Sequence, residues 1–205
     1  GSDYADQGYI YPQNSTYYYG FVMDKEAVSD PRVRRALPMA VDRVTLVDNV
    51  LQGGQIPANV LTNPANFGSP ALDPEVAPWA LSEDAGGTGY DAAVEMGKEL
   101  LAEAGYPDGA GLNLTVAHNV QEGHAKIAQA IQAMWTAAYP QIQVTVESQE
   151  WGAYLEALRN ESDPAGKPDV FRLGWNADYP HANNWVHEVM NPQAGANRVM
   201  MSPDD

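Results

Sequence analysis

The sequence contains no cysteine, few basic residues and no long apolar run, and each absence excludes a class of protein. Without cysteine, the 205-residue chain cannot form a disulfide, a thiolate nucleophile or a cysteine-ligated metal site. Lysine and arginine number 11 against 27 aspartates and glutamates, so the formal net charge is −16 and no basic stripe exists for nucleic acid or an anionic membrane. No run of about 18 apolar residues is present, so no transmembrane helix is predicted. The 44% hydrophobic content is enough for the core of one acidic globular domain.

Signatures of catalysis and of metal binding are also missing. Neither a G-x-S-x-G nucleophile elbow nor an HExxH motif occurs. The four histidines form two pairs spaced six residues apart, which places the members of each pair on different helix faces: His118 with His124, and His181 with His187. The sequence therefore predicts no metal, no cofactor and no enzymatic activity. A hydrolase that uses paired carboxylates is the distant alternative. In so acidic a chain, however, carboxylate pairs are common by chance and do not by themselves indicate a catalytic site.

Turn and cap residues divide the first part of the chain into a strand and a broken helix. Residues 16–23 are rich in strand-forming side chains and predict a β-strand. Asp30 is expected to cap a helix with a proline in its first position. Pro38 should kink that helix or split it in two, because proline lacks the N–H that an interior helical position needs. The glycine pair Gly53-Gly54 is expected to end the second piece.

The segment 54–90 is long for a loop in a compact domain. It contains five prolines, so packing of its few large side chains must order it. Phe67, Trp79 and Tyr90 are the expected anchors. Asp91 is expected to cap the helix that follows the loop.

Between residues 112 and 175 the pattern alternates between strand and helix. This alternation predicts an α/β fold in which a mixed sheet is flanked by helices. The central helix, 123–139, should bury one apolar face, formed by Ile127, Ile131, Met134 and Trp135. In such sheets ligands bind beyond the carboxyl ends of the strands. The residues that follow Ala117 and Leu173 are therefore the first candidates for a binding site.

Aromatic and acidic side chains follow the last predicted strand. Trp175 and Tyr179 flank Asp178 there. An aromatic wall excludes water, and a carboxylate beside it can make a strong charge-assisted hydrogen bond to a ligand amine. The alternative is a core tryptophan followed by an ordinary turn aspartate before Pro180.

Four blocks of this sequence resemble, in order, those of the family 5 extracellular solute-binding proteins, which include oligopeptide- and dipeptide-binding proteins of ABC importers. The blocks read SDPRVRRALPMAVDRVTLVDNVLQGG, KELLAEAGYPDG, QAIQAMWTAAYPQIQVTVESQEWGAYLEAL and FRLGWNADYPHANNW. The resemblance implies the second lobe of a type II periplasmic-binding-protein fold. Residues 3–205 would be this one lobe of a larger two-lobed protein, and Gly1 and Ser2 look like the remnant of a tag.

The resemblance also implies a set of ligand-binding residues. Asp178 matches the aspartate that pairs with a peptide's amino group, with Trp175 beside it. Arg172 matches a basic residue that can meet a ligand carboxylate. The other matching positions are Trp151, Asn119 and His124. The sequence departs from the family at His181, which replaces an aspartate, and at Leu158, which replaces a second basic residue with Arg159 one position late.

The implied function is capture of a peptide or similar amine-bearing solute for an ABC importer. The expected partners are that solute and the importer's membrane subunits, and the protein is expected to be a monomer. It should be periplasmic or extracellular and anchored as a lipoprotein in its full-length form. A binder of a non-peptide solute, such as an oligosaccharide or a metal-chelate complex, is the alternative.

Overall fold

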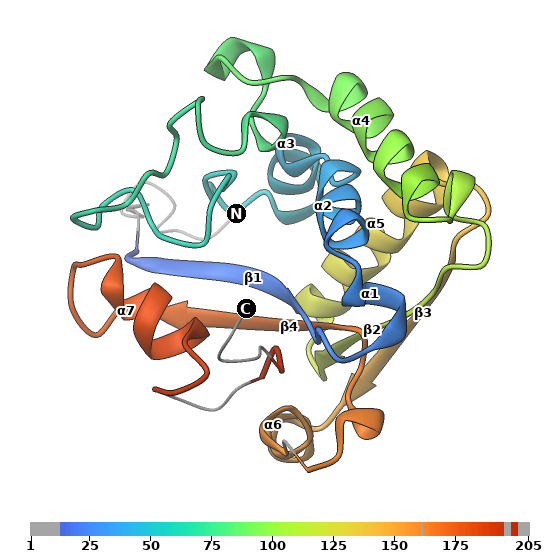
Figure 1. The fold of residues 1–205 in the computed structure, drawn as a ribbon. Coiled ribbons are helices and arrows are strands. Elements are labelled where there is room, and N and C mark those ends of the chain that lie inside the picture. Colours follow the sequence, from blue (N-terminus) through green and yellow to red (C-terminus); the bar gives the residue numbers. More distant parts are fainter. Residues whose placement is uncertain (1–12, 161, 195–197, 201–205) are drawn as a thin grey trace, which may run out of the picture.

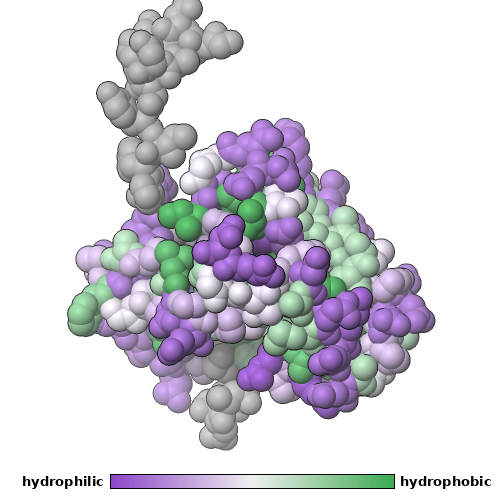
Figure 2. Space-filling model, turned by 90° about the horizontal axis from the view of Figure 1, so that it is seen from above, coloured by the Kyte–Doolittle hydropathy of each residue, from purple (hydrophilic) through white to green (hydrophobic). Residues whose placement is uncertain are grey.

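The computed structural model describes residues 13–160, 162–194 and 198–200, with a sheet at the centre and helices on both of its faces (Figure 1). The expected tag remnant at the first two residues lies outside this described part. In Figure 1, α2, α4 and α5 lie on one side of the sheet, and α6 and α7 lie on the other. Figure 2 shows the molecule from above, where hydrophilic residues are spread over the face and hydrophobic ones form small, separated patches.

The sheet has four strands in the order β1-β4-β2-β3. The central strand β2 is parallel to both of its neighbours, whereas β1 runs antiparallel to β4. The mixed sheet flanked by helices confirms the fold class expected from the sequence. The strand bounds are β1 Ser15–Phe21, β2 Asn113–Asn119, β3 Gln143–Gln149 and β4 Val170–Asn176.

Two helices make the crossover connections between the parallel strands. Helix α5 (Glu122–Ala138) joins β2 to β3, and α6 (Trp151–Arg159) joins β3 to β4. Helix α5 buries Ile127, Ile131 and Trp135 at its core face, as its periodicity predicted, while Met134 is only half-buried. The Trp135 indole Nε1 donates to the Leu37 carbonyl at 2.7 Å, so the ring is both packed and hydrogen-bonded.

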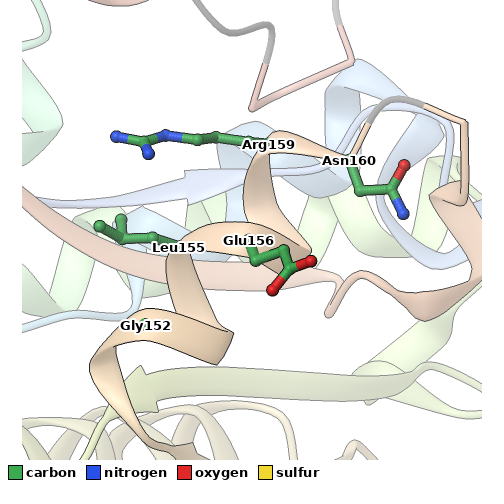
Figure 3. Close-up of a pocket in the computed structure, with 5 residues that line it drawn as sticks. All are labelled: Gly152, Leu155, Glu156, Arg159 and Asn160. Carbon is green, nitrogen blue, oxygen red and sulfur yellow. The ribbon is translucent and has the colours of Figure 1, made fainter.

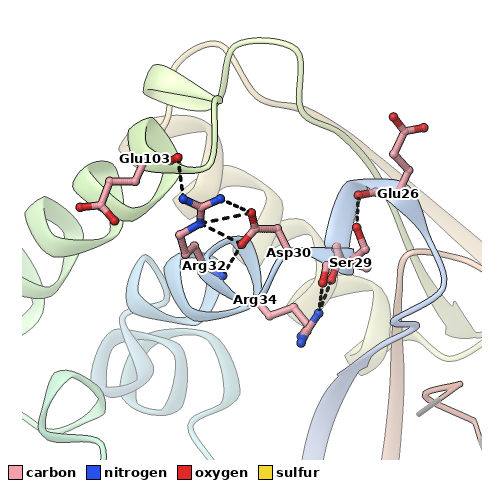
Figure 4. Close-up of polar contacts among 7 residues, drawn as sticks. Glu26, Ser29, Asp30, Arg32, Arg34 and Glu103 are labelled. Carbon is pink, nitrogen blue, oxygen red and sulfur yellow. Dashed lines mark hydrogen bonds and ion pairs between the residues drawn. The ribbon is translucent and has the colours of Figure 1, made fainter. Parts of the chain in front are cut away.

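The first helices begin and break where the sequence predicted. Short α1 (Glu26–Ser29) precedes α2 (Pro31–Met39), whose N-cap Asp30 accepts a hydrogen bond from the Arg32 amide. Figure 4 shows the Arg32 guanidinium between the Asp30 carboxylate and the Glu103 carbonyl, which ties α2 to α4. With Pro38 in its last turn, α2 ends at Met39, and the chain continues as α3 (Arg43–Thr45) and a π-helical segment, Leu46–Leu51. The expected split is confirmed.

Two expected helix boundaries were wrong. The π-helical segment ends at Leu51, and the next residue, Gln52, adopts the left-handed conformation (φ 53°) before the chain reaches Gly53-Gly54. Helix α4 (Tyr90–Glu103) is preceded by Gly89 at φ 80°, and Asp91 lies inside the first turn with its side chain exposed. A positive φ favours glycine, so the chain enters α4 through Gly89 and not through an aspartate cap.

The long loop is held mainly by polar contacts. Phe67 is 78% exposed, so the expectation that its side chain anchors the loop was wrong. The Trp79 ring lies 5.2 Å from the Arg43 guanidinium, and Tyr90 is half-buried. Inside the loop, the buried Asn59 amide donates to the Val76 carbonyl at 2.8 Å and accepts from the Leu72 amide at 2.9 Å. Backbone groups that aromatic packing would leave unpaired are satisfied in this way.

The hydrophobic core lies on both faces of the sheet, and the remaining elements are short helices. The larger apolar cluster fills the space between the sheet and α2, α4 and α5, and a smaller one lies under α6. The short 3₁₀ segments are Pro78–Ala80, Glu83–Ala85, Pro107–Gly109 and Pro164–Gly166. The last helical segments among the described residues are α7 (Asn183–Trp185) and the π-helical Val186–Met190.

Candidate functional site

A hollow of about 320 Å³ lies at the edge of the sheet where β2 and β4 end and β1 begins. Its position agrees with the rule that ligands bind beyond the carboxyl ends of strands in such sheets. Three of the expected site residues line it: Trp151 from α6, and Arg172 and Trp175 from β4. The remaining lining residues are Ser15, Thr16, Tyr17, Gly174 and Asn176.

Arg172 is the cation of this hollow and is held in place from two sides. Its Nη1 donates to Asn119 Oδ1 at 3.0 Å, and its guanidinium carbon lies 4.3 Å from the centre of the Tyr17 ring. Its Nε is buried and has no hydrogen-bond partner among the described residues. A guanidinium that lines the hollow and is already held in place suits an anionic ligand group, because it can form bidentate charge-assisted hydrogen bonds.

His124 joins the same cluster as a neutral ring. Its Nδ1 lies 3.3 Å from the Tyr17 hydroxyl. Burial lowers the pKa of His124 to about 4, and the positive charge of Arg172 and the nearby His118 act in the same direction. At neutral pH the ring is therefore a polar, uncharged partner, and Arg172 carries the charge of the cluster.

Tyr154 supports this cluster from α6, although no motif in the sequence singles it out. Its side chain is buried, and its hydroxyl accepts a hydrogen bond from the Arg172 amide at 2.9 Å. The same hydroxyl lies 2.9 Å from the Ala117 carbonyl and 2.8 Å from the Arg172 carbonyl. These contacts connect α6 to β2 and β4 beside Arg172. In the sequence Tyr154 resembles any apolar position of an amphipathic helix.

Asp178 lies in the turn after β4 and does not line the hollow. Its carboxylate Oδ2 accepts a hydrogen bond from Asn184 Nδ2 at 3.1 Å. Asn184 Oδ1 accepts from the Trp175 indole at 2.7 Å, so one buried asparagine contacts both predicted residues. Trp175 is half-buried and lines the hollow, which differs from the alternative of a core tryptophan. Tyr179 is 38% exposed, and its hydroxyl accepts from Asn183 at 2.9 Å.

The structure thus brings the predicted residues together in two groups. Arg172, Asn119 and His124 form one group around the Tyr17 ring. Trp175, which lines the hollow, and Asp178 form the other, because both contact Asn184. Trp151 is 47% exposed at the start of α6 and forms an aromatic wall of the hollow. Within the described ranges, no group of three or more histidine, aspartate or glutamate side chains is placed to hold a metal ion. The arrangement offers a fixed cation, a fixed anion and aromatic surface.

A second hollow, of about 470 Å³, lies on the outer side of α6. Figure 3 shows Leu155 and Arg159 pointing to one side of this helix and Glu156 to the other. Leu158, which the resemblance aligns with a basic residue of the family, is fully buried on the inner face of α6. Arg159, one position later, lines this outer hollow and not the hollow at the edge of the sheet.

Comparison with known proteins places these features in one family. Residues 2–197 match the family described as bacterial extracellular solute-binding proteins, family 5 Middle. The chain is 34% identical over 193 residues to the periplasmic murein peptide-binding protein MppA of Escherichia coli, covering 94% of this chain and 33% of that protein. It is 30% identical over 192 residues to the periplasmic oligopeptide-binding protein OppA of Salmonella typhimurium, again covering 94% and 33%.

Solved structures give the same result for the fold. The structure of the E. coli murein tripeptide binding protein MppA matches with a TM-score of 0.78 at 30% identity, over 94% of this chain and 35% of that one. A complex of Haemophilus influenzae OppA with RPPGFSPFR matches with a TM-score of 0.73 at 28% identity, over 94% and 35%. The chain therefore spans about a third of the length of the relatives it matches. In the part of the chain that the structure describes, no helix is long and apolar enough to cross a membrane.

Proposed function

The chain belongs to the family 5 bacterial extracellular solute-binding proteins, and we propose that it forms one lobe of a protein that captures peptides for an ABC importer. The family match spans residues 2–197, and relatives at 30–34% identity are named as peptide-binding proteins. The proposed role is binding without chemical conversion of the solute. Relatives are named as periplasmic, and we propose the same compartment for the full-length protein, with a lipid anchor.

The observation that carries this proposal is a pair of opposite charges at one edge of the sheet. Arg172 lines the hollow with its guanidinium, and Asp178 has a carboxylate in the turn that follows the same strand. A free peptide carries an ammonium at one end and a carboxylate at the other. Each end loses water when a ligand is enclosed, and a buried charge must be paired.

In this proposal the other half of the binding site comes from the part of the full-length protein that lies outside this chain. The hollow is open on this chain, whereas ligand sites bury most of the ligand's surface. A second lobe that closes over the edge of the sheet would bury the peptide between two surfaces. The full-length protein would act as a monomer and deliver the peptide to the importer's membrane subunits.

Native mass spectrometry of the full-length protein, purified without denaturation, tests this function directly. We expect bound peptides that are released on unfolding and identified by fragmentation. A protein that is refolded without ligand and then incubated with a peptide mixture should take up peptides again. Recovery of only non-peptide solutes, with no uptake from the mixture, would contradict the proposal.

One comparison favours a second candidate, a solute without an amine. The chain is 33% identical over 180 residues to a probable deoxycholate-binding periplasmic protein of E. coli, covering 88% of this chain and 31% of that protein. The aromatic walls formed by Trp151 and Trp175 would suit an apolar ring system. Such a ligand would make no use of Asp178. Binding that is unaffected by Asp178→Asn therefore separates this candidate from the peptide proposal.

A further inference from the structure

Asn184 is a buried polar residue that connects the two groups expected to meet a ligand amine. It lies in α7 with none of its surface exposed. Its Oδ1 accepts from the Trp175 indole Nε1 at 2.7 Å and from the Asp178 amide at 3.1 Å, and its Nδ2 donates to Asp178 Oδ2 at 3.1 Å. One side chain therefore fixes a ring, a backbone amide and a carboxylate.

The chemistry of its neighbours determines which way the Asn184 amide points. The Trp175 indole and the Asp178 backbone amide can only donate, so the atom facing both must be the oxygen. The Asp178 carboxylate can only accept when it is ionised, so the atom facing it must be the nitrogen. No other side chain of this size offers an acceptor on one side and a donor on the other without carrying a charge. Aspartate at this position would keep the first contact and lose the second.

The segment that carries Asn184 is itself braced from the long loop. The Phe67 amide donates to the Pro180 carbonyl at 3.4 Å, and the Ala182 amide donates to the Phe67 carbonyl at 3.0 Å. The Asn184 amide donates to the His181 carbonyl at 3.0 Å. Phe67 thus contributes through its backbone, although its side chain is exposed. This bracing fixes the point from which Asn184 reaches back to Trp175 and Asp178.

From this geometry we propose that Asn184 is a positioning residue for recognition of the peptide's amino end. The inference rests on the proposed function, because it assigns a role within the peptide site. Asn184 neither lines the hollow nor meets the ligand. It holds the Trp175 ring beside the Asp178 carboxylate, so that an incoming ammonium finds an oriented anion against an aromatic wall. Holding both groups in place before binding reduces the ordering that binding would otherwise require.

Two variants in the full-length protein separate the two contacts of Asn184. Asn184→Ala removes both, whereas Asn184→Asp keeps an acceptor for Trp175 and places a second carboxylate against Asp178. Hydrogen exchange of the ¹⁵N-labelled indole groups, with Trp175 assigned by Trp175→Phe, reports the first contact. We expect Trp175 to exchange at least about tenfold faster in the alanine variant and to stay protected in the aspartate variant. The fully buried Trp185 serves as an internal control for the fold and should stay protected in both.

Calorimetry with trialanine and RPPGFSPFR, each free and N-acetylated, reports the second contact. Both variants should bind the free peptides about tenfold more weakly, which is roughly 1.4 kcal/mol, and the acetylated peptides within about twofold of the unmodified protein. The matched control is Gln193→Glu, which adds the same charge on an exposed side chain of the described segment that follows α7. It should keep the full preference for the free peptides.

Four outcomes bear on the inference in different ways. Equal weakening of free and acetylated peptides in both variants would show a merely structural role and overturn it. Unchanged affinity for the free peptides in Asn184→Ala would also overturn it. If the unmodified protein binds both forms of a peptide equally well, the inference fails while the peptide function stands; if it binds neither peptide in either form, the proposed peptide function fails. The indole exchange of Trp175 then still decides whether Asn184 holds that ring.

Discussion

At the scale of single residues, the site is a set of polar groups whose positions are fixed before any ligand arrives. Arg172 is held by Asn119 and by the Tyr17 ring, and Asp178 is held by Asn184. Charged groups that already have partners do not need to be reorganised when a ligand replaces water around them. This is the condition under which a charge-assisted hydrogen bond contributes most to affinity.

The lowered pKa of His124 gives a prediction about acid stability. In the unfolded chain His124 takes up a proton near its ordinary pKa of 6.5, whereas in the folded chain it resists protonation until about pH 4. Between these values the unfolded state binds more protons, so acidification destabilises the fold. Between pH 7 and pH 5, the free energy of unfolding should fall by about 1 kcal/mol less in the His124→Gln variant than in the unmodified chain. This figure allows for the water around a half-exposed ring.

Denaturant unfolding of this chain and of its His124→Gln variant, at pH 7 and at pH 5, checks this prediction. The unmodified chain should lose more stability on acidification than the variant. His187→Gln is the matched control, because that ring is exposed. Equal losses in the unmodified chain and in His124→Gln would contradict the burial of His124 against Arg172.

Sequence reasoning succeeded for residues whose chemistry shows in their type and position. Trp175, Asp178 and Arg172 follow or lie within a predicted strand, so their place in the fold could be expected. Asn184 and Tyr154 could not be found in this way. Asparagine in a short helix carries no periodic signal, and Tyr154 occupies an ordinary core position of α6. Their roles arise from hydrogen bonds to groups that are distant in the sequence or belong to another element.

At the scale of elements, α2, α4 and α5 pack closely against one another on one face of the sheet. Gly97 of α4 lies against the Tyr139 ring, whose hydroxyl donates to the Ala36 carbonyl at 2.7 Å. A methyl group at position 97 would overlap that hydroxyl and would lie 3.2 Å from the Ala36 carbonyl. Glycine is therefore required here by close approach and not by its backbone conformation.

This contact predicts a coupled effect on stability. Gly97→Ala alone should destabilise the fold by about 1–3 kcal/mol through overpacking, although alanine favours a helix. Tyr139→Phe alone should cost about 1–2 kcal/mol, because it leaves the Ala36 carbonyl unpaired. The double variant should cost clearly less than the sum, since removing the hydroxyl makes room for the methyl group. Thermal and denaturant unfolding of the four proteins measures the coupling, and strict additivity would contradict it.

Element boundaries were less predictable than the elements. The α/β layer, the succession of strands and helices along the chain, and the break after Pro38 followed from periodicity and proline. The start of α4 and the role of Phe67 did not. Gly89 precedes α4 with a positive φ, which no composition rule reveals. Phe67 contributes backbone hydrogen bonds that any residue could make. Such features depend on long-range contacts and not on local preference.

At the scale of the whole molecule, the proposed function gives this chain one side of a two-sided binding site. Its hollow is open, and the relatives it matches are about three times longer. Half of the contacts that enclose a ligand would therefore come from the rest of the protein. We expect the 205-residue chain alone to bind peptides at least about 100-fold more weakly than the full-length protein. Calorimetry on both proteins measures this ratio, and full-strength binding by the chain alone would contradict the two-lobe proposal.

The most direct test of the account is a four-way calorimetric comparison in the full-length protein. It combines the unmodified protein and Asp178→Asn with one peptide in its free and N-acetylated forms. Removing one partner of a buried charge pair typically costs about 2–5 kcal/mol. Asp178→Asn should therefore weaken binding of the free peptide by at least about 30-fold, and acetylation should cost a similar factor. Both changes together should cost clearly less than their sum, because they remove the same interaction. Normal binding by Asp178→Asn, or equal binding of free and acetylated peptides by the unmodified protein, would contradict amine recognition at this site.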